Sequence, residues 1–186
     1  MSIPAPPAAT KPKPKLTDAP KKLRPVADVL PHSDEAERSV LGAMLIDNRH
    51  IPKARTIVST ADFYSIRHQS MFESILELAD EGTDVDLVTL KDALNAKGMI
   101  DKSGGPAYMA ELVQGVPRSA NVQSYAAIVY ERARQRDVIE ITEQIRSRTL
   151  DQDAANEEIL ALVKRMGEAA AVKRHGGLVV QELATI

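Results

Sequence analysis

The feature that most constrains the fold is a stretch of 28 residues without glycine or proline, residues 121–148. Proline breaks a helix interior and glycine weakens it, so a long stretch lacking both is typical of one continuous helix. Its apolar residues form two stripes at helical spacing, rotated from each other: Val122, Ala126, Val129 and Ala133, then Val138, Ile141 and Ile145. At about 1.5 Å per residue, this helix would extend well beyond a compact bundle.

A second helix is predicted to run back along the first. Its apolar residues repeat at helical spacing and make a stripe that suits a partner helix: Ile159, Leu162, Val163, Met166, Ala169 and Ala170. The sequence therefore predicts an antiparallel helical hairpin over residues 119–173. Apolar stripes on more than one side leave two alternatives open. The hairpin projects and associates with a second copy, or it folds back on the rest of the chain.

The residues before the hairpin, 31–118, are predicted to form a compact bundle of shorter helices. Ser33 and Asp86 are typical helix N-caps. The periodicity favours helices over 34–46, 49–58, 66–80, 87–96 and 107–115. The expected core consists of Leu41, Leu45, Phe63, Phe72, Leu90 and Leu94. No convincing alternating strand pattern occurs, so the predicted fold class is all-α, a compact multi-helix bundle followed by a long antiparallel helical hairpin.

Residues 1–30 have a different composition from the rest. They contain seven of the eleven prolines and six basic side chains against two acidic ones, a net charge of +4. Such a segment cannot bury enough apolar surface to offset the entropy of ordering it, so a disordered tail is predicted. The favoured interpretation is a solvated tail, and the alternative is a weak electrostatic contact with nucleic acid.

The sequence offers no residues for catalysis by this chain alone. There is no cysteine, so disulfides and thiolate zinc sites are excluded. No Gly-Lys dipeptide occurs, so the phosphate-binding loop GxxxxGK[ST] is absent, and the four histidines show no metal-binding spacing. We therefore expect no catalytic residue, no metal and no cofactor in these residues. No run of 18 apolar residues and no signal-like N-terminus occur, so the expected compartment is the cytoplasm, without a membrane partner.

The densest basic group of the predicted folded part is formed by Arg132, Arg134 and Arg136. Helix geometry places Arg132 and Arg136 on one face and Arg134 on another. Nearby carboxylates such as Asp137 can pair with them. A salt-bridged helix surface or a subunit contact is favoured over a DNA-binding groove.

Several short runs in order resemble one family. They are Pro31–Gly42 with Leu45 and Asp47, then Asp62-Phe63-Tyr64 with His68 and Met71-Phe72, Asp86–Leu90, Gly104-Gly105 with Tyr108 and Ala110–Leu112, and finally Ser119–Asn121 with Tyr125-Ala126, Ile128-Val129, Glu131–Ala133 and Arg136. Together they resemble the N-terminal domain of bacterial replicative DNA helicases of the DnaB type, over residues 31–173. Residues 178–183 resemble the start of the linker that joins this domain to the family's motor domain, so 174–186 is interpreted as linker.

The resemblance implies an oligomerisation and primase-docking domain in DNA replication. In the family these domains pair through their hairpins, and three pairs form a collar above a ring of motor domains. Primase and self are therefore the expected partners, with a helicase loader as a further one, and DNA is encircled or weakly bound at most. The family's ATP and Mg²⁺ belong to the motor domain, whose Walker motifs these residues lack.

The resemblance also suggests which residues make contacts. The expected oligomer interface comprises Tyr125, Ile128, Val129, Arg132, Arg136, Ile159, Leu162, Val163 and Met166. The alternative for Leu162, Val163 and Met166 is that they only join the two hairpin helices. Glu35 and Tyr108 are the expected partner contacts. Two other functions stay open at this point: a stand-alone adaptor that regulates a complete helicase, and a helical module that binds nucleic acid through the basic tail.

Overall fold

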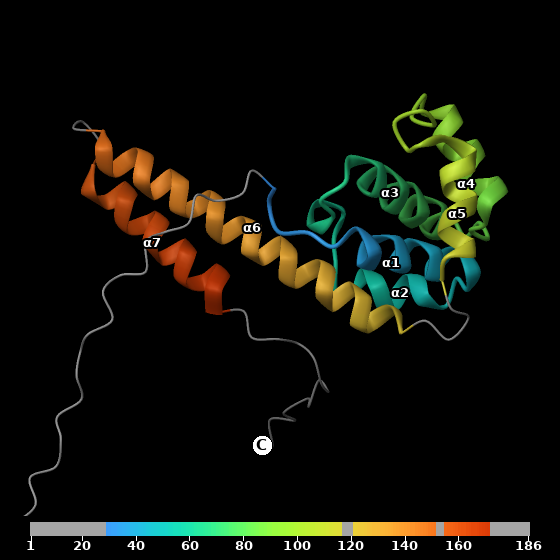
Figure 1. Ribbon diagram of the computed structural model, residues 1–186, viewed down its shortest axis with the longest axis horizontal. Coiled ribbons are helices and arrows are strands. Elements are labelled where there is room, and N and C mark those ends of the chain that lie inside the picture. Colours follow the sequence, from blue (N-terminus) through green and yellow to red (C-terminus); the bar gives the residue numbers. More distant parts are fainter. Residues whose placement is uncertain (1–28, 117–120, 152–154, 172–186) are drawn as a thin grey trace, which may run out of the picture.

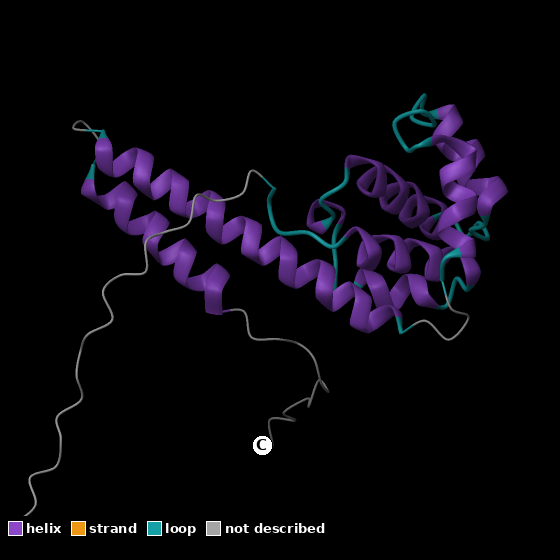
Figure 2. Cartoon of the chain, in the orientation of Figure 1, coloured by secondary structure: helices purple, strands orange, loops and turns teal. Residues whose placement is uncertain are grey.

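The computed structural model describes residues 29–116, 121–151 and 155–171. Within these residues all regular structure is helical, and no strand occurs (Figure 2). The elements are α1 (Asp34–Ile46), α2 (His50–Arg55), the short 3-10 helix η1 (Thr60–Asp62), α3 (Ile66–Asp80), α4 (Leu87–Ala96), α5 (Gly105–Gln114), α6 (Val122–Leu150) and α7 (Asn156–Ala171). The all-α prediction is confirmed.

Local chemistry sets most helix ends where the sequence indicated. The Ser33 side chain accepts a hydrogen bond from the Ala36 amide (3.3 Å), and Asp86 accepts from the amides of Val88 and Thr89. The N-cap of α5 is Gly104, whose φ of +87° lies in the left-handed region that glycine adopts most readily. The helix predicted over 49–58 is shorter than expected and covers His50–Arg55, because the chain then turns and buries Val58 in the core.

The bundle surrounds one hydrophobic core to which α1 to α5 and the first half of α6 contribute. All six core residues expected from the sequence are buried. The rings of Phe63 and Phe72 contact each other at 4.8 Å between centroids. The first apolar stripe of α6, from Val122 to Ala133, is buried as well. Helix α6 therefore begins inside the bundle and is part of its core.

The second half of α6 leaves the bundle and carries α7 with it (Figure 1). Helix α7 runs antiparallel to α6 and packs against it. The 29 residues of α6 span about 44 Å. The hairpin therefore projects, and the alternative in which it folds back on the bundle is not observed. The predicted tail and linker fall largely or entirely on 1–28 and 172–186, outside the described residues.

Candidate functional site

The hairpin helices carry large apolar side chains that the described residues leave in contact with solvent. Leu150 is 72% exposed, Leu160 66%, Val163 43% and Ile128 38%. On α7, Leu160 and Val163 share a face with Gly167, because their spacing of three and seven residues matches the helical period. A Cβ built on Gly167 meets nothing within 4 Å. We call Leu160, Val163 and Gly167 the hairpin ridge; it is open to a further helix.

The other apolar residues of α7 join the two hairpin helices. Ile159, Leu162 and Met166 are half-buried and lie on the side of α7 that faces α6. Met166 Sδ lies 3.8 Å from the Thr142 hydroxyl of α6. Of the four α7 residues predicted at the interface, three thus contact α6 within the hairpin, and only Val163 is exposed. Leu160 was not among the predicted interface residues, although its spacing of three residues from Val163 indicated a second apolar stripe.

On α6 the predicted interface residues also differ in accessibility. Ile128 is exposed, and Tyr125 is half-buried against the core. Val129 has an exposed fraction of only 1% and belongs to the core of the bundle. The expectation that Val129 faces a second chain is therefore corrected, because the bundle already covers its side chain.

Two arginines of α6 tie the hairpin to the bundle. Arg134 forms an ion pair with the buried Asp62 carboxylate (3.0 Å) and a second one with Asp137 (2.8 Å). Arg136 donates hydrogen bonds to the backbone oxygens of Pro31 (2.9 Å) and Asp62 (2.6 Å). Arg132 stays on its own helix and donates to Gln135 (2.9 Å). The salt-bridge interpretation is confirmed for Arg134, and its longest-range partner, Asp62, was not foreseen.

A buried polar network links α1, α3 and α5. The Glu37 carboxylate accepts hydrogen bonds from the backbone amides of Tyr64 (2.8 Å) and Ser65 (3.3 Å), and it lies 2.6 Å from Nδ1 of His68. Nε2 of His68 lies 2.6 Å from the hydroxyl of Tyr108. Glu37 and His68 are almost fully buried, whereas Tyr108 is half-buried. Tyr108, expected to contact a partner, is therefore held in place by an internal hydrogen bond.

The electrostatics of this network keep Glu37 ionised. Burial alone would raise the pKa of its carboxyl group, but the hydrogen bond with His68 and the two backbone amide donors outweigh burial and lower that pKa. Burial and the Asp34 carboxylate raise the pKa of Tyr108, so its hydroxyl stays neutral. The guanidinium of Arg67 lies 4.5 Å and that of Arg38 5.5 Å from the Tyr108 ring centroid. The arrangement is typical of a structural network that fixes three helices.

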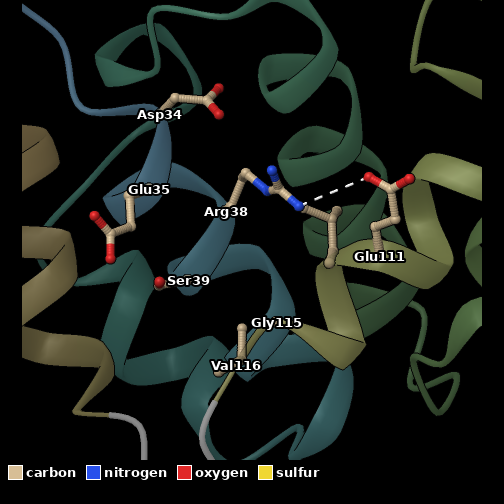
Figure 3. Close-up of a pocket in the computed structure, with 8 residues that line it drawn as sticks. Asp34, Glu35, Arg38, Ser39, Glu111, Gly115 and Val116 are labelled. Atoms are coloured by element: carbon tan, nitrogen blue, oxygen red, sulfur yellow. Dashed lines mark ion pairs between the residues drawn. The ribbon is translucent and has the colours of Figure 1, made fainter.

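A pocket of about 250 Å³ opens between the first turn of α1 and the end of α5 (Figure 3). Asp34 and Glu35 line it on α1, and Glu111 lines it on α5. The Arg38 side chain reaches toward Glu111, with 3.8 Å between their charged groups, while Glu35 points away from this pair (Figure 3). The pocket places Glu35, an expected partner contact, at an exposed and net acidic edge of the bundle.

The part of the chain that the structure describes shows no group of histidine, aspartate and glutamate side chains suited to a metal ion. Among the described helices, none is long and apolar enough to cross a membrane. The surface features considered for function are therefore the hairpin ridge and the acidic edge of the bundle.

Comparison with known proteins gives a consistent result. A model of the DnaB-like helicase N-terminal domain matches residues 29–131. The chain is 40% identical over 116 residues to the replicative DNA helicase DnaB of Buchnera aphidicola subsp. Baizongia pistaciae, covering 62% of this chain and 25% of that protein. It is 33% identical over 162 residues to that of Haemophilus influenzae, covering 82% of this chain and 34% of that protein. The chain thus spans a quarter to a third of the length of these relatives.

Solved structures show the same fold. The crystal structure of the N-terminal domain of DnaB helicase from Mycobacterium tuberculosis superimposes with a TM-score of 0.68 at 30% identity, over 76% of this chain and 97% of that one. The N-terminal domain of DnaB helicase from Helicobacter pylori, described together with its interactions with primase, matches with a TM-score of 0.56 over 63% of this chain and 91% of that one. At 18% identity the second match supports the fold alone.

Proposed function

Because this chain belongs to the family of DnaB-like helicase N-terminal domains, we propose that it is the oligomerisation and primase-docking domain of a replicative DNA helicase. ATP-driven unwinding, with its ATP and Mg²⁺, then belongs to a motor domain outside these residues. The compartment that goes with this function is the cytoplasm. The observation that carries the proposal is the projecting hairpin (Figure 1), whose ridge is apolar, exposed and not covered by any of the described residues.

Self-association through the hairpin ridge follows from the burial pattern. Full burial of a leucine or valine side chain contributes roughly 1.5–3 kcal/mol, and Leu160 and Val163 would contribute in proportion to the 66% and 43% of their surface that is exposed. Gly167 beside them lets a second helix approach closely, since nothing occupies the space around its Cα. Ile128 in the first half of α6 and Leu150 at its end are further exposed apolar side chains. A pair of hairpins packed along these surfaces would be the building block of a collar.

Docking of primase is supported by the resemblance of the fold to DnaB proteins described together with their interactions with primase. On this chain the acidic edge at Glu35 is the surface we propose for that contact. Glu35 is exposed and points away from the neighbouring ion pair, so it is free to meet a basic side chain. Tyr108 would contribute indirectly, because it holds Arg38 and Arg67 against its ring.

Substitution Val163→Asp is expected to weaken self-association about 100-fold while the helical content stays unchanged. In a symmetric pair the change occurs twice. Each copy loses the burial of the exposed 43% of Val163 and brings an unpaired carboxylate out of water, about 3 kcal/mol in total, which corresponds to that factor. Light scattering of the 186-residue chain as a function of concentration measures the change. Ala161→Asp is the matched control, because it places the same charge on another side of α7 and is expected to leave the mass unchanged. A strictly monomeric wild-type protein would contradict the proposed collar.

Substitution Glu35→Ala is expected to weaken binding of primase about fivefold, the effect of losing one exposed ion pair of about 1 kcal/mol. The affinity is measured by calorimetry between the full chain and primase at fixed salt. Asp101→Ala removes another exposed carboxylate of the bundle and serves as the control. Equal affinities of wild type and Glu35→Ala would remove Glu35 from the contact, and no binding by wild type would contradict primase docking as a whole.

A further inference from the structure

A second surface of the bundle has no part in the function proposed above. A groove of about 470 Å³ lies between the second half of α3 and helix α4. Apolar side chains that line it, here called its floor, are Leu78, Ala93 and Ala96. Charged side chains that line it, here called its rim, are Glu77, Glu81, Asp92 and Lys97. The groove is therefore shaped for a segment with both apolar and positively charged groups.

The charges at the rim are not balanced within the described chain. Lys97 pairs with Glu77 across the groove. The carboxylates of Glu81 and Asp92 are exposed, and no ion pair with either is found among the described residues. The whole bundle, residues 29–116, contains 14 acidic and 8 basic side chains, a net charge of −6. Two carboxylates next to an apolar floor thus remain available to a basic occupant.

A segment with the complementary chemistry precedes the bundle in the same chain. Residues 1–28 carry a net charge of +4, with Lys11, Lys13 and Lys15 alternating with prolines and followed by Leu16. Proline limits the conformations that such a segment loses on binding, which lowers the entropic cost of docking. If this segment lies in the groove, its lysines can meet the carboxylates of the rim and Leu16 can meet the apolar floor.

The tether makes the encounter favourable although each exposed ion pair contributes little. Twelve residues, 17–28, separate Leu16 from the start of the described bundle at Val29, and the 13 steps from one Cα to the next can span about 40 Å when extended. Helix α3, which forms one wall of the groove, is about 22 Å long. A covalent connection of this length gives an effective concentration of about a millimolar.

We propose that the Lys/Pro segment 11–16 docks in the groove between α3 and α4 of its own chain, with its lysines facing Glu81 and Asp92 and Leu16 on the apolar floor. The contact covers an acidic part of the bundle that a basic partner would otherwise meet. It is independent of the hairpin ridge and of the acidic edge at Glu35, so its failure would not affect the proposed function.

The absence of cysteine allows a direct test in the full chain. A nitroxide is attached to Ala9→Cys, and the amide signals of ¹⁵N-labelled protein are recorded by NMR. We expect the signals of Leu78, Ala93 and Ala96 to lose at least half of their intensity at 0.1 M salt. The loss should disappear at 1 M salt, where the screening length falls from about 10 Å to about 3 Å.

The charge variant Glu81→Gln/Asp92→Asn should abolish the signal loss at 0.1 M salt. Its control, Glu35→Gln/Asp101→Asn, removes the same total charge from other exposed positions of the bundle and should leave the loss intact. Signal loss that survives in the groove variant, or that falls on the hairpin, would overturn the proposal. So would an equal loss in a mixture of nitroxide-bearing unlabelled protein with unmodified ¹⁵N protein, because the segment would then act between chains.

Discussion

Substitution Glu37→Ala is expected to lower the free energy of unfolding by about 3–5 kcal/mol, the cost of breaking a buried charged pair from one side. The carboxylate has three partners: the amides of Tyr64 and Ser65 and the ring of His68. Because all of them lie in or next to the interior, removing Glu37 leaves buried polar groups without a partner. The carboxylate also lies at the N-terminus of α3, where a negative charge is favourable.

Urea unfolding at pH 7 measures this loss, and Glu35→Ala is the control. Glu35 is two residues away on the same helix but exposed, so its removal should change stability by less than about 0.5 kcal/mol. The pKa of Glu37 is lowered in the folded protein, so its contribution is present above the ordinary value of 4.5 and is lost as the pH falls below it. The difference between wild type and Glu37→Ala should therefore shrink in acid. Equal stabilities at pH 7 would contradict this account of the network.

Substitution Gly42→Ala is expected to destabilise the bundle by about 3 kcal/mol, at the upper end of the overpacking range. A Cβ at Gly42 of α1 would lie 2.4 Å from the backbone oxygen of Leu112 and 2.5 Å from Cγ2 of Val116. The side chain of Val116 can move, but the backbone of α5 cannot do so without displacing the helix. Gly42 therefore sets the distance between α1 and α5.

The matched control is Gly167→Ala, measured by urea unfolding in the monomeric Val163→Asp background. Gly167 lies within α7 and has nothing within 4 Å of a built Cβ. Alanine there should stabilise the chain by roughly 0.5–1 kcal/mol, because glycine is the poorer helix former. The same chemical change is thus expected to have opposite signs at the two positions. Stabilisation at both positions would show that helix propensity decides the effect and that α5 does not pack too closely against Gly42 to admit a Cβ.

The elements that local chemistry specifies could be predicted from the sequence. The third helix was expected over 66–80, and α3 covers those residues. The caps Ser33 and Asp86 were identified because a side chain and the amides it binds lie within three residues of each other. Such signals depend only on neighbours along the chain, which a sequence displays directly.

Contacts between distant residues could not be predicted in the same way. Asp62 and Arg134 are 72 positions apart, and Glu37 and His68 are 31 apart. Periodicity identifies an apolar face but does not indicate what covers it. For this reason Val129 was assigned to a partner although the bundle buries it, while the exposed Leu160 was overlooked.

One continuous helix joins the core of the bundle to the tip of the hairpin, and it therefore works as a lever arm. Arg134 and Arg136 fix the fulcrum, where α6 meets Asp62 and Pro31. From there to Leu150 the arm is about 21–24 Å long, so a tilt of 10° at the fulcrum moves its end by about 4 Å. In a ring built from such arms, two guanidinium groups at the base of each would set the width of the opening.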